Sequence, residues 1–224
     1  MGGGLGAMPL GANQIIVEYI LKKLSFTSII ILVFLYGCGS TKSSLLNKDP
    51  SFNSNDFFNS SITIYSPLSV SISNSKYSDY KEEDAKYEIT NLLKQGIEKS
   101  SPRTNVIIGK ESVPSYFRGI LINKEAGTQF LKNTKTKYIV FVQQVLVGED
   151  SKMQSINTST GVPFSYSQSE TKTTMYFDIW NKDVGAAVFS IEVKAAINDG
   201  LLVNSLNSSF SNAVDEFISN INKK

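Results

Sequence analysis

The sequence predicts an α/β domain, a two-layer α+β sandwich in which helices pack on one mixed sheet of about five strands. Two kinds of pattern predict it: runs with apolar residues at alternate positions, typical of strands, and stretches with apolar residues at helical spacing. A third observation is their order along residues 62–224, which is β-α-β-α-β-β-β-α. The chain has 224 residues, 41% of them hydrophobic, which is enough for one domain of this kind.

The first strand and helix are expected between residues 62 and 100. Residues 62–72 have apolar side chains at alternate positions, which indicates a strand with one buried face. Pro67 cannot donate a ladder hydrogen bond, so this strand lies at a sheet edge or is broken there. Asp79 and Glu82 have the spacing of a capping box. We expect a helix after them that stops at Ser100-Ser101-Pro102.

The middle of the domain combines two strands, a helix and a polar stretch. Residues 105–109 predict a short buried strand, and a helix is expected over residues 124–133. Residues 138–147 are apolar on both faces at first, which indicates a central strand. Residues 151–174 are rich in Ser, Thr, Gln and Lys and predict a long polar loop, either disordered or an extended hairpin.

The C-terminal part predicts a hairpin and a helix. Residues 175–180 and 186–196 are expected to be strands joined by a turn at residues 181–185, with Gly near its end. Leu206 to Ile221 has a clean amphipathic spacing and predicts the last helix.

The N-terminal region has the features of a lipoprotein signal peptide over residues 21–37. Lys22 and Lys23 precede an uncharged apolar segment that is shorter than the roughly 20 residues of a membrane span. Leu35-Tyr36-Gly37-Cys38 resembles the bacterial lipobox. This resemblance implies cleavage before Cys38 and a lipid on its sulfur. Tyr36 departs from the usual small or β-branched residue of that motif.

Two further segments flank the signal peptide. Residues 1–20 do not belong to such a signal, and we expect them to be a mis-called extension, with Leu21 as the true initiator. Residues 38–61 are rich in Ser, Asn and Lys and predict a flexible tether before a single domain at 62–224. The aromatic residues Phe52, Phe57 and Phe58 are either a segment that docks on the domain or part of the tether.

Composition argues against several classes of function. A net charge of +2, with Arg103 and Arg118 as the arginines, gives no reason to expect nucleic acid binding. The absence of His removes the commonest general base and metal ligand, and one Cys excludes a disulfide or a Cys metal cluster. Asp178 and Glu192 lie on neighbouring predicted strands, where a pair of surface carboxylates is the simpler interpretation. We expect no enzyme, no catalytic residue, no cofactor and no metal.

Two local patterns carry a resemblance to known proteins. Residues 130–142 run from a helix end into the central strand, and residues 176–189 form a strand, a turn with Gly185 and a second strand. Both are similar to passages in envelope lipoproteins of the curli-secretion-channel and penicillin-binding-protein activator types, whose α/β domain is like the N-terminal domain of TolB. Lys137 and Val184 depart from that pattern. The resemblance implies a non-enzymatic role in binding or assembling other envelope components.

The sequence therefore predicts a lipoprotein anchored through Cys38 in a bacterial envelope, in the outer membrane if there are two membranes, on its periplasmic face or surface. We expect it to bind another envelope protein; the oligomeric state stays open. Aromatic and arginine side chains in predicted loops or at a strand end are the candidate contacts: Tyr116, Phe117, Arg118, Phe164, Tyr166 and Trp180. Core packing is the alternative for each. The alternative functions are a surface adhesin or antigen and, less favoured, an envelope enzyme.

Overall fold

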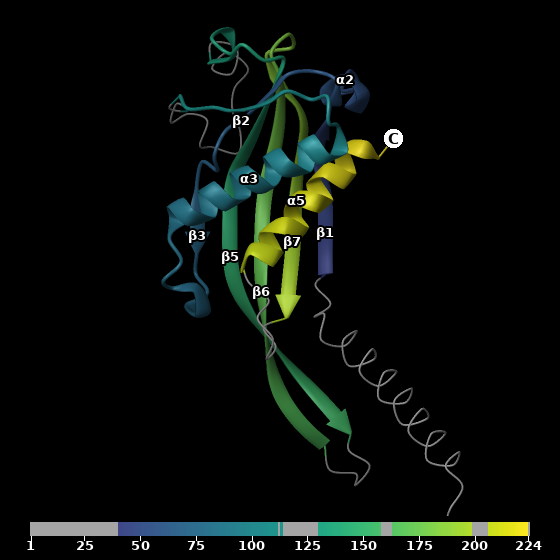
Figure 1. Ribbon diagram of the computed structural model, residues 1–224. Helices are drawn as coiled ribbons and strands as arrows, with labels where there is room; N and C mark the ends of the chain where they lie inside the picture. The colour runs from purple at the N-terminus through teal and green to yellow at the C-terminus, as the bar shows by residue number, and fades with distance from the viewer. Residues whose placement is uncertain (1–39, 112, 114–129, 158–162, 199–205, 224) are drawn as a thin grey trace, which may run out of the picture. The chain divides into compact units, whose positions relative to one another are not determined.

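The computed structural model describes residues 40–111, 113, 130–157, 163–198 and 206–223. They form a seven-stranded mixed sheet with two long helices, α3 (Glu82–Ser100) and α5 (Leu206–Asn222), on one face (Figure 1). The predicted α/β fold is confirmed, with more strands than the five expected.

The sheet has a parallel and an antiparallel part. Its order is β1 (Ser40–Lys48), β7 (Ala186–Asn198), β6 (Pro163–Asn181), β5 (Tyr138–Asn157), β2 (Ile62–Ile64) and β4 (Val106–Ile108), and β3 (Val70–Ile72) pairs with β5 further along. The strands β2 and β3 run parallel to β5, and β4 runs parallel to β2. The other pairs are antiparallel. Helix α3 makes the crossover that two parallel neighbours such as β2 and β4 require.

The predicted first strand is broken, as Pro67 indicates. Its two halves, β2 and β3, both pair with β5, and the amides of Tyr65 and Leu68 on either side of the proline donate to carbonyls of β5. The two halves therefore share one neighbouring strand.

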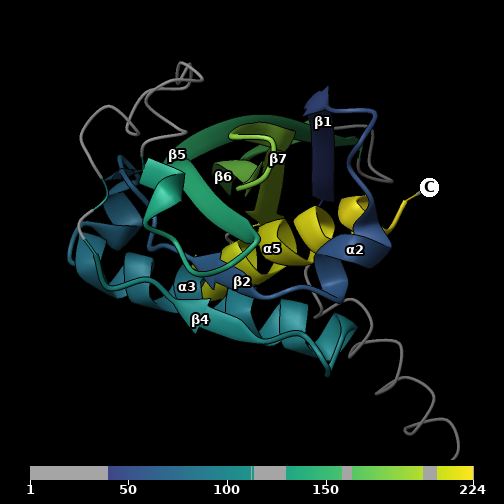
Figure 2. The same cartoon turned by 90° about the horizontal axis from the view of Figure 1, so that it is seen from above.

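The main core lies between the sheet and the two helices (Figure 2). Its aromatic members include Phe177 and Phe217, whose rings stack with centroids 4.3 Å apart. Gly96 of α3 faces Ile218 and Val214 of α5 so closely that a Cβ there would lie 2.4 Å from Ile218 Cδ1. The glycine allows the two helices to approach.

The predicted capping box is wrong. Helix α3 has Lys81 as its N-cap residue and no side-chain cap hydrogen bond. Instead, three acidic residues in its first turn, Glu82, Glu83 and Asp84, complement the helix dipole. Of the helix expected over residues 124–133, the described part contains Phe130–Lys132, which are helical.

The expected tether over residues 38–61 is also wrong where the chain is described. Strand β1 pairs with β7 along its length, and a short helix, α2 (Ser54–Phe58), follows it. Phe52, Phe57 and Phe58 are buried in the main core, so the docking alternative holds for the three aromatic residues. This segment is part of the domain.

The polar stretch over residues 151–174 forms an extended hairpin. Strand β5 continues to Asn157, and β6 begins at Pro163, so the expected loop is largely two paired strands. The turn between β6 and β7 is as predicted, and Gly185 has a φ of 69° in it. A 3-10 helix, η1 (Ser75–Tyr77), completes the described elements.

The signal-peptide residues Lys22, Lys23, Leu35 and Gly37 and the lipidation residue Cys38 lie outside the described residues. Within the described part, the helices are too short or too polar for any of them to cross a bilayer.

Candidate functional site

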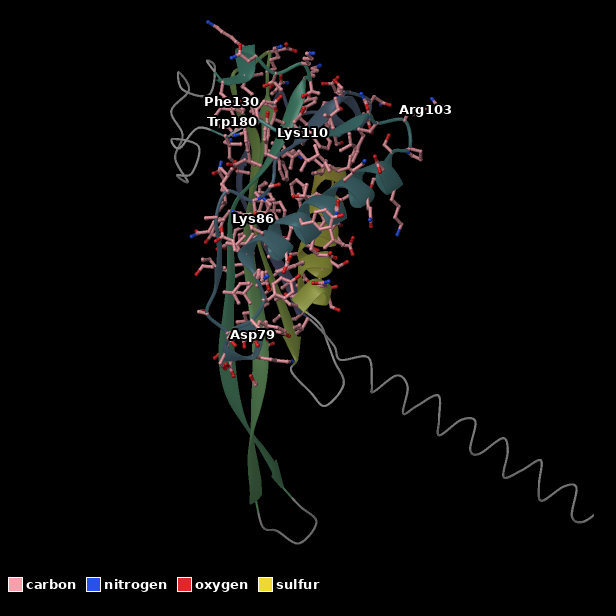
Figure 3. The ribbon with its side chains drawn as sticks, turned by 60° about the vertical axis from the view of Figure 1, so that its left-hand side comes forward. Asp79, Lys86, Arg103, Lys110, Phe130 and Trp180 are labelled. Carbon is pink, nitrogen blue, oxygen red and sulfur yellow. The ribbon has the colours of Figure 1, made fainter. Side chains whose placement is uncertain are left out.

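A cavity of about 550 Å³ opens at the carboxyl ends of β2 and β4. Tyr65 follows β2, and Gly109, Lys110 and Glu111 follow β4, while Phe130 and residues 133–136 form the opposite wall. Figure 3 shows Phe130, Trp180 and Lys110 at this end of the sheet and Asp79 at the other. Ligands of open α/β sheets commonly bind at the carboxyl ends of parallel strands.

The floor of the cavity is aromatic. The ring of Tyr65 stacks on Phe141 with centroids 5.4 Å apart and meets Phe130 edge-on at 5.6 Å. Beneath these rings lies a small core on the sheet face opposite α3 and α5, which also contains Ile139 and Trp180. Such a floor offers apolar and edge-to-face contacts to a bound group.

Gly109 sets how close the chain comes to this floor. A Cβ at this position would lie 2.3 Å from Cε1 of Tyr65, with two further ring atoms within 2.7 Å. The ring also contacts Phe141 and Phe130, which restrict its movement away from such a Cβ. Glycine is therefore required for β4 to pass over the Tyr65 ring.

The rim carries two lysines and one glutamate. The Tyr65 hydroxyl donates to Glu111 Oε2 at 3.2 Å. Burial, and then the negative charge of Glu111, raises the pKa of Tyr65 to about 12, so its hydroxyl stays protonated at neutral pH. The backbone amide of Glu111 and the Tyr65 hydroxyl lower the pKa of the Glu111 carboxyl, and the charge of Lys135 adds to this. With Lys110, the rim has a net charge of +1 at neutral pH.

The opposite wall is tied to the sheet by hydrogen bonds. The hydroxyls of Thr63 and Thr136 are 2.8 Å apart, and the Thr136 hydroxyl also donates to the carbonyl of Tyr138. Lys182 in the β6–β7 turn donates to the Thr134 carbonyl. These bonds preorganise the cavity, which reduces the cost of ordering it on binding.

The arrangement offers apolar and charged contacts to a bound group. Its volume lies in the usual range of ligand pockets, roughly 300–1,000 Å³. The aromatic floor accepts an apolar group, and Lys110 and Lys135 favour an acidic one nearby. A side chain or a small ligand with both features matches it.

The residues that the sequence predicts as partner contacts have different outcomes in the structure. Trp180 is only 2% exposed and packs in the small core under the cavity, so its prediction as a contact is wrong and the packing alternative holds. Tyr116, Phe117 and Arg118 lie outside the described residues. Phe164 and Tyr166 lie in β6, paired with Ile156 and Gln154 near the far end of the hairpin.

Sequence reasoning missed the residues that form the cavity. Tyr65, Lys110 and Glu111 belong to no motif, and Lys135 lies in the pattern of residues 130–142 without being singled out there. A signal was present: two short apolar strands, each followed at once by aromatic or charged residues, are expected to be parallel neighbours if a helix joins them. Their carboxyl ends then meet.

The two carboxylates on neighbouring strands do not face each other. Asp178 accepts a hydrogen bond from Gln143 at 3.0 Å and another from Ser190, and burial raises its pKa. Glu192 accepts from the hydroxyl of Tyr176 at 2.7 Å and pairs with Lys194. Each carboxylate has its own partners, and no acid–base couple forms between them.

Comparisons with known proteins give distant likenesses. The chain matches no known protein family and no curated protein. Among solved structures, it is similar to the PelC dodecamer of Paraburkholderia phytofirmans (12% identity, 84% of this chain and 99% of that chain, TM-score 0.42). A putative neuraminyllactose-binding hemagglutinin homolog from Helicobacter pylori is also similar (10%, 73% and 81%, 0.43), as is a minor lipoprotein from Acinetobacter baumannii (13%, 71% and 87%, 0.27). Likeness at this level carries no argument about function.

Proposed function

We propose that this chain is a lipid-anchored protein of a bacterial cell envelope, which binds another envelope component and is not an enzyme. The observation that carries the proposal is the position of Cys38. This cysteine ends an apolar segment with a basic start, and it stands two residues before β1. The lipobox resemblance implies that the chain is cut next to this cysteine and that the cysteine receives the lipid.

Such an anchor holds firmly only with more than one acyl chain, because a single chain gives marginal, reversible membrane binding. The lipobox resemblance implies two or three chains on Cys38. The following residues enter β1, which is hydrogen-bonded to β7 over its whole length. The anchor would therefore be attached directly to the sheet.

The cavity supports a binding role. The row of sheet residues that contains Ile64 and Ile108, of which Ile108 lines the cavity, is eight positions along β5 from the row that contains Ser40, counted from Val140 to Gly148. At about 3.3 Å per residue this is roughly 26 Å, so the cavity lies at the end of the sheet away from the anchored end. A partner would meet it there, with an acidic group near Lys110 and Lys135.

The anchor is tested by labelling growing cells with radioactive palmitate. We expect label on the protein and its recovery in the membrane fraction, and both are lost in Cys38→Ser. Mass spectrometry of the mature chain should find an acylated Cys38 as the first residue. An unlabelled wild-type chain, or a mature chain that still contains residues 21–37, contradicts the proposal.

The binding role is tested by photo-crosslinking in cells. A photoreactive amino acid at Ile107, which is 44% exposed and lines the cavity, should give a discrete adduct with one envelope protein. The matched control is Tyr87, which is 71% exposed on α3 and should give none. Combining the probe with Lys110→Glu and Lys135→Glu should abolish the adduct. No adduct at Ile107, or the same adduct at Tyr87, argues against a partner at the cavity.

Protease treatment of intact cells decides where the domain works. Digestion would place it on the surface and favour an adhesin, whereas protection that is lost when the outer membrane is permeabilised would place it in the periplasm.

A further inference from the structure

Strands β5 and β6 extend well beyond the rest of the sheet (Figure 1). Pairing between β6 and β7 ends at Glu170 and Asn198, and pairing between β3 and β5 ends at Val147. Beyond these points, residues 151–157 and 163–169 pair with each other in seven successive rows. We call this two-stranded segment the arm. At about 3.3 Å per residue it is roughly 23 Å long.

The arm leaves the sheet at the end where the chain enters β1. Ser40, the first residue of β1, pairs with Ala196; Ala196 pairs with Lys172, and Lys172 pairs with Gly148. These four residues form one row across the sheet. Because β1 and β5 run in opposite directions, β1 toward lower residue numbers and β5 toward higher residue numbers leave this row on the same side. The arm therefore projects in the direction in which β1 runs back to its first residue.

Chain length limits how far Cys38 can lie from this row. Two residues separate it from Ser40, so the two Cα atoms are at most about 7 Å apart. The arm, in contrast, extends nine residues past Gly148, which is about 30 Å. If Cys38 carries the lipid, as the proposed function holds, the arm reaches farther toward the bilayer than the anchor itself.

We propose that the arm lies along the surface of the bilayer to which Cys38 is anchored and contacts its phospholipid headgroups. The inference rests on the proposed lipid anchor. The anchor forces the arm to meet the membrane, because an arm that is longer than the anchor segment has to enter the bilayer or lie across it.

Insertion is excluded by the backbone of the arm. A two-stranded ribbon leaves the outward N–H and C=O groups of both strands without ladder partners, and these groups cannot be satisfied in the hydrocarbon. In the headgroup region, water and lipid oxygens satisfy them. The sheet axis is therefore tilted from the membrane normal, so that the arm lies flat.

The residue pattern of the arm is suited to an interface. The register puts Ile156 opposite Phe164 and Gln154 opposite Tyr166, and these two adjacent same-face rows carry the aromatic residues. Lys152, paired with Gln168, continues this face. The other face is formed mainly by Ser positions, with Met153, Asn157 and Pro163. Aromatic residues and lysines on one face are typical of segments that lie in the headgroup region.

The test uses the fact that the chain has a single cysteine, which the lipid would occupy. A new cysteine in the arm, Ile156→Cys, is labelled in the full acylated protein with the fluorophore NBD. The protein is then bound to vesicles of phosphatidylethanolamine and phosphatidylglycerol. Ser155→Cys reports the other face of the arm, and Asp183→Cys, in the exposed turn at the opposite end of the sheet, is the matched control.

We expect a blue-shifted emission at position 156 that headgroup spin-labelled lipid quenches several-fold more strongly than at position 183, with position 155 intermediate. Water-like emission at 156 on protein that floats with the vesicles overturns the inference and leaves the anchor intact. Stronger quenching at 156 by lipids labelled in mid-chain also overturns it, since the arm would then be inserted. Wild-type protein that does not float any better than Cys38→Ser would instead contradict the proposed function.

Discussion

Gly109 is the residue on which the cavity depends most directly. Any side chain there overlaps the Tyr65 ring, and this ring is held between Phe130 and Phe141. We expect Gly109→Ala to lower the free energy of unfolding by about 1–3 kcal/mol, the usual cost of overpacking a filled site. Urea unfolding followed by the fluorescence of Trp180, the one tryptophan, measures this.

The matched control is Gly148→Ala. Its added Cβ would meet only Ser73 Oγ, at 3.8 Å, which is an ordinary contact. This variant should stay within about 0.5 kcal/mol of wild type. Equal stability of the Gly109 variant would show that the Tyr65 ring can move, and the cavity would then not be preorganised.

Asp178 makes the stability depend on pH. Burial raises the pKa of its carboxyl in the folded state, so the fold favours the protonated form. That contribution is fully present below the unfolded pKa, about 3.9, and is lost as pH rises through the higher folded pKa. Asp178→Asn, which keeps an acceptor and carries no charge, should stabilise the domain at pH 8 by on the order of 1 kcal/mol and change little near pH 3.5.

The measurement is chemical unfolding of wild type and variant at a series of pH values. Asp183→Asn, in the exposed β6–β7 turn, serves as the control and should change the free energy of unfolding by less than about 0.5 kcal/mol. If Asp178→Asn destabilises the domain more at pH 8 than at pH 3.5, the ionised carboxylate stabilises the fold and the assignment is wrong.

At the scale of elements, the short helix α2 ties the N-terminal segment to the sheet. Phe57 is fully buried and meets the rings of Phe52, Phe58 and Tyr138 at 5.1–6.2 Å. Asp56 accepts from the Tyr138 hydroxyl at 2.5 Å and pairs with Lys137 at 2.8 Å. Residues that the sequence suggests to be a linker thus form one wall of the core.

We expect Phe57→Ala to cost about 3–5 kcal/mol of unfolding free energy, because it leaves a cavity in the main core. Denaturant unfolding checks the value. Tyr87→Ala, at an exposed site on α3, is the comparison and should change stability by less than about 0.5 kcal/mol. A loss no larger than that of the Tyr87 variant would mean that the segment packs only loosely, as a tether does.

The elements that bury one apolar face could be predicted from the sequence. The strands that are held mainly by backbone hydrogen bonds could not. Helix α5 and the first part of β5 bury apolar side chains at regular spacing, so their periods are visible in the sequence. Strand β1 is an edge strand whose Ser and Lys side chains are mostly exposed, and its backbone hydrogen bonds to β7 leave no mark in the composition. The backbone pairing of residues 151–157 with 163–169 likewise leaves no mark in the composition.

The cavity could not be predicted from the sequence for a related reason. Its residues come from three separate stretches, and only the parallel pairing of β2 with β4 brings two of them together. Trp180 shows the opposite error: a large aromatic residue at a strand end suggested a contact, but tertiary packing uses it as core. Trp180 therefore serves packing, and the cavity lies where two short strands end.

At the scale of the whole domain, the arm and the cavity lie at opposite ends of the sheet. The row of Ser40 is next to the arm, and the row of Ile64 borders the cavity. An anchor at Cys38 would hold the arm against the membrane and leave the cavity at the end of the sheet away from the anchor. The short connection between Cys38 and β1 therefore couples the position of the arm at the membrane to the position of the cavity.

A longer connection should therefore release the arm. Inserting 20 Gly and Ser residues between Gly39 and Ser40 adds a mean span of roughly 25 Å, about the length of the arm. In vesicles, we expect NBD at Ile156→Cys to lose its blue shift and become accessible to aqueous iodide, while palmitate labelling and flotation stay unchanged. The same insertion in the β6–β7 turn, after Asp183, is the control and should leave the emission blue-shifted. If the arm stays at the lipid surface despite the linker, its own affinity for the bilayer, and not the short anchor, holds it there.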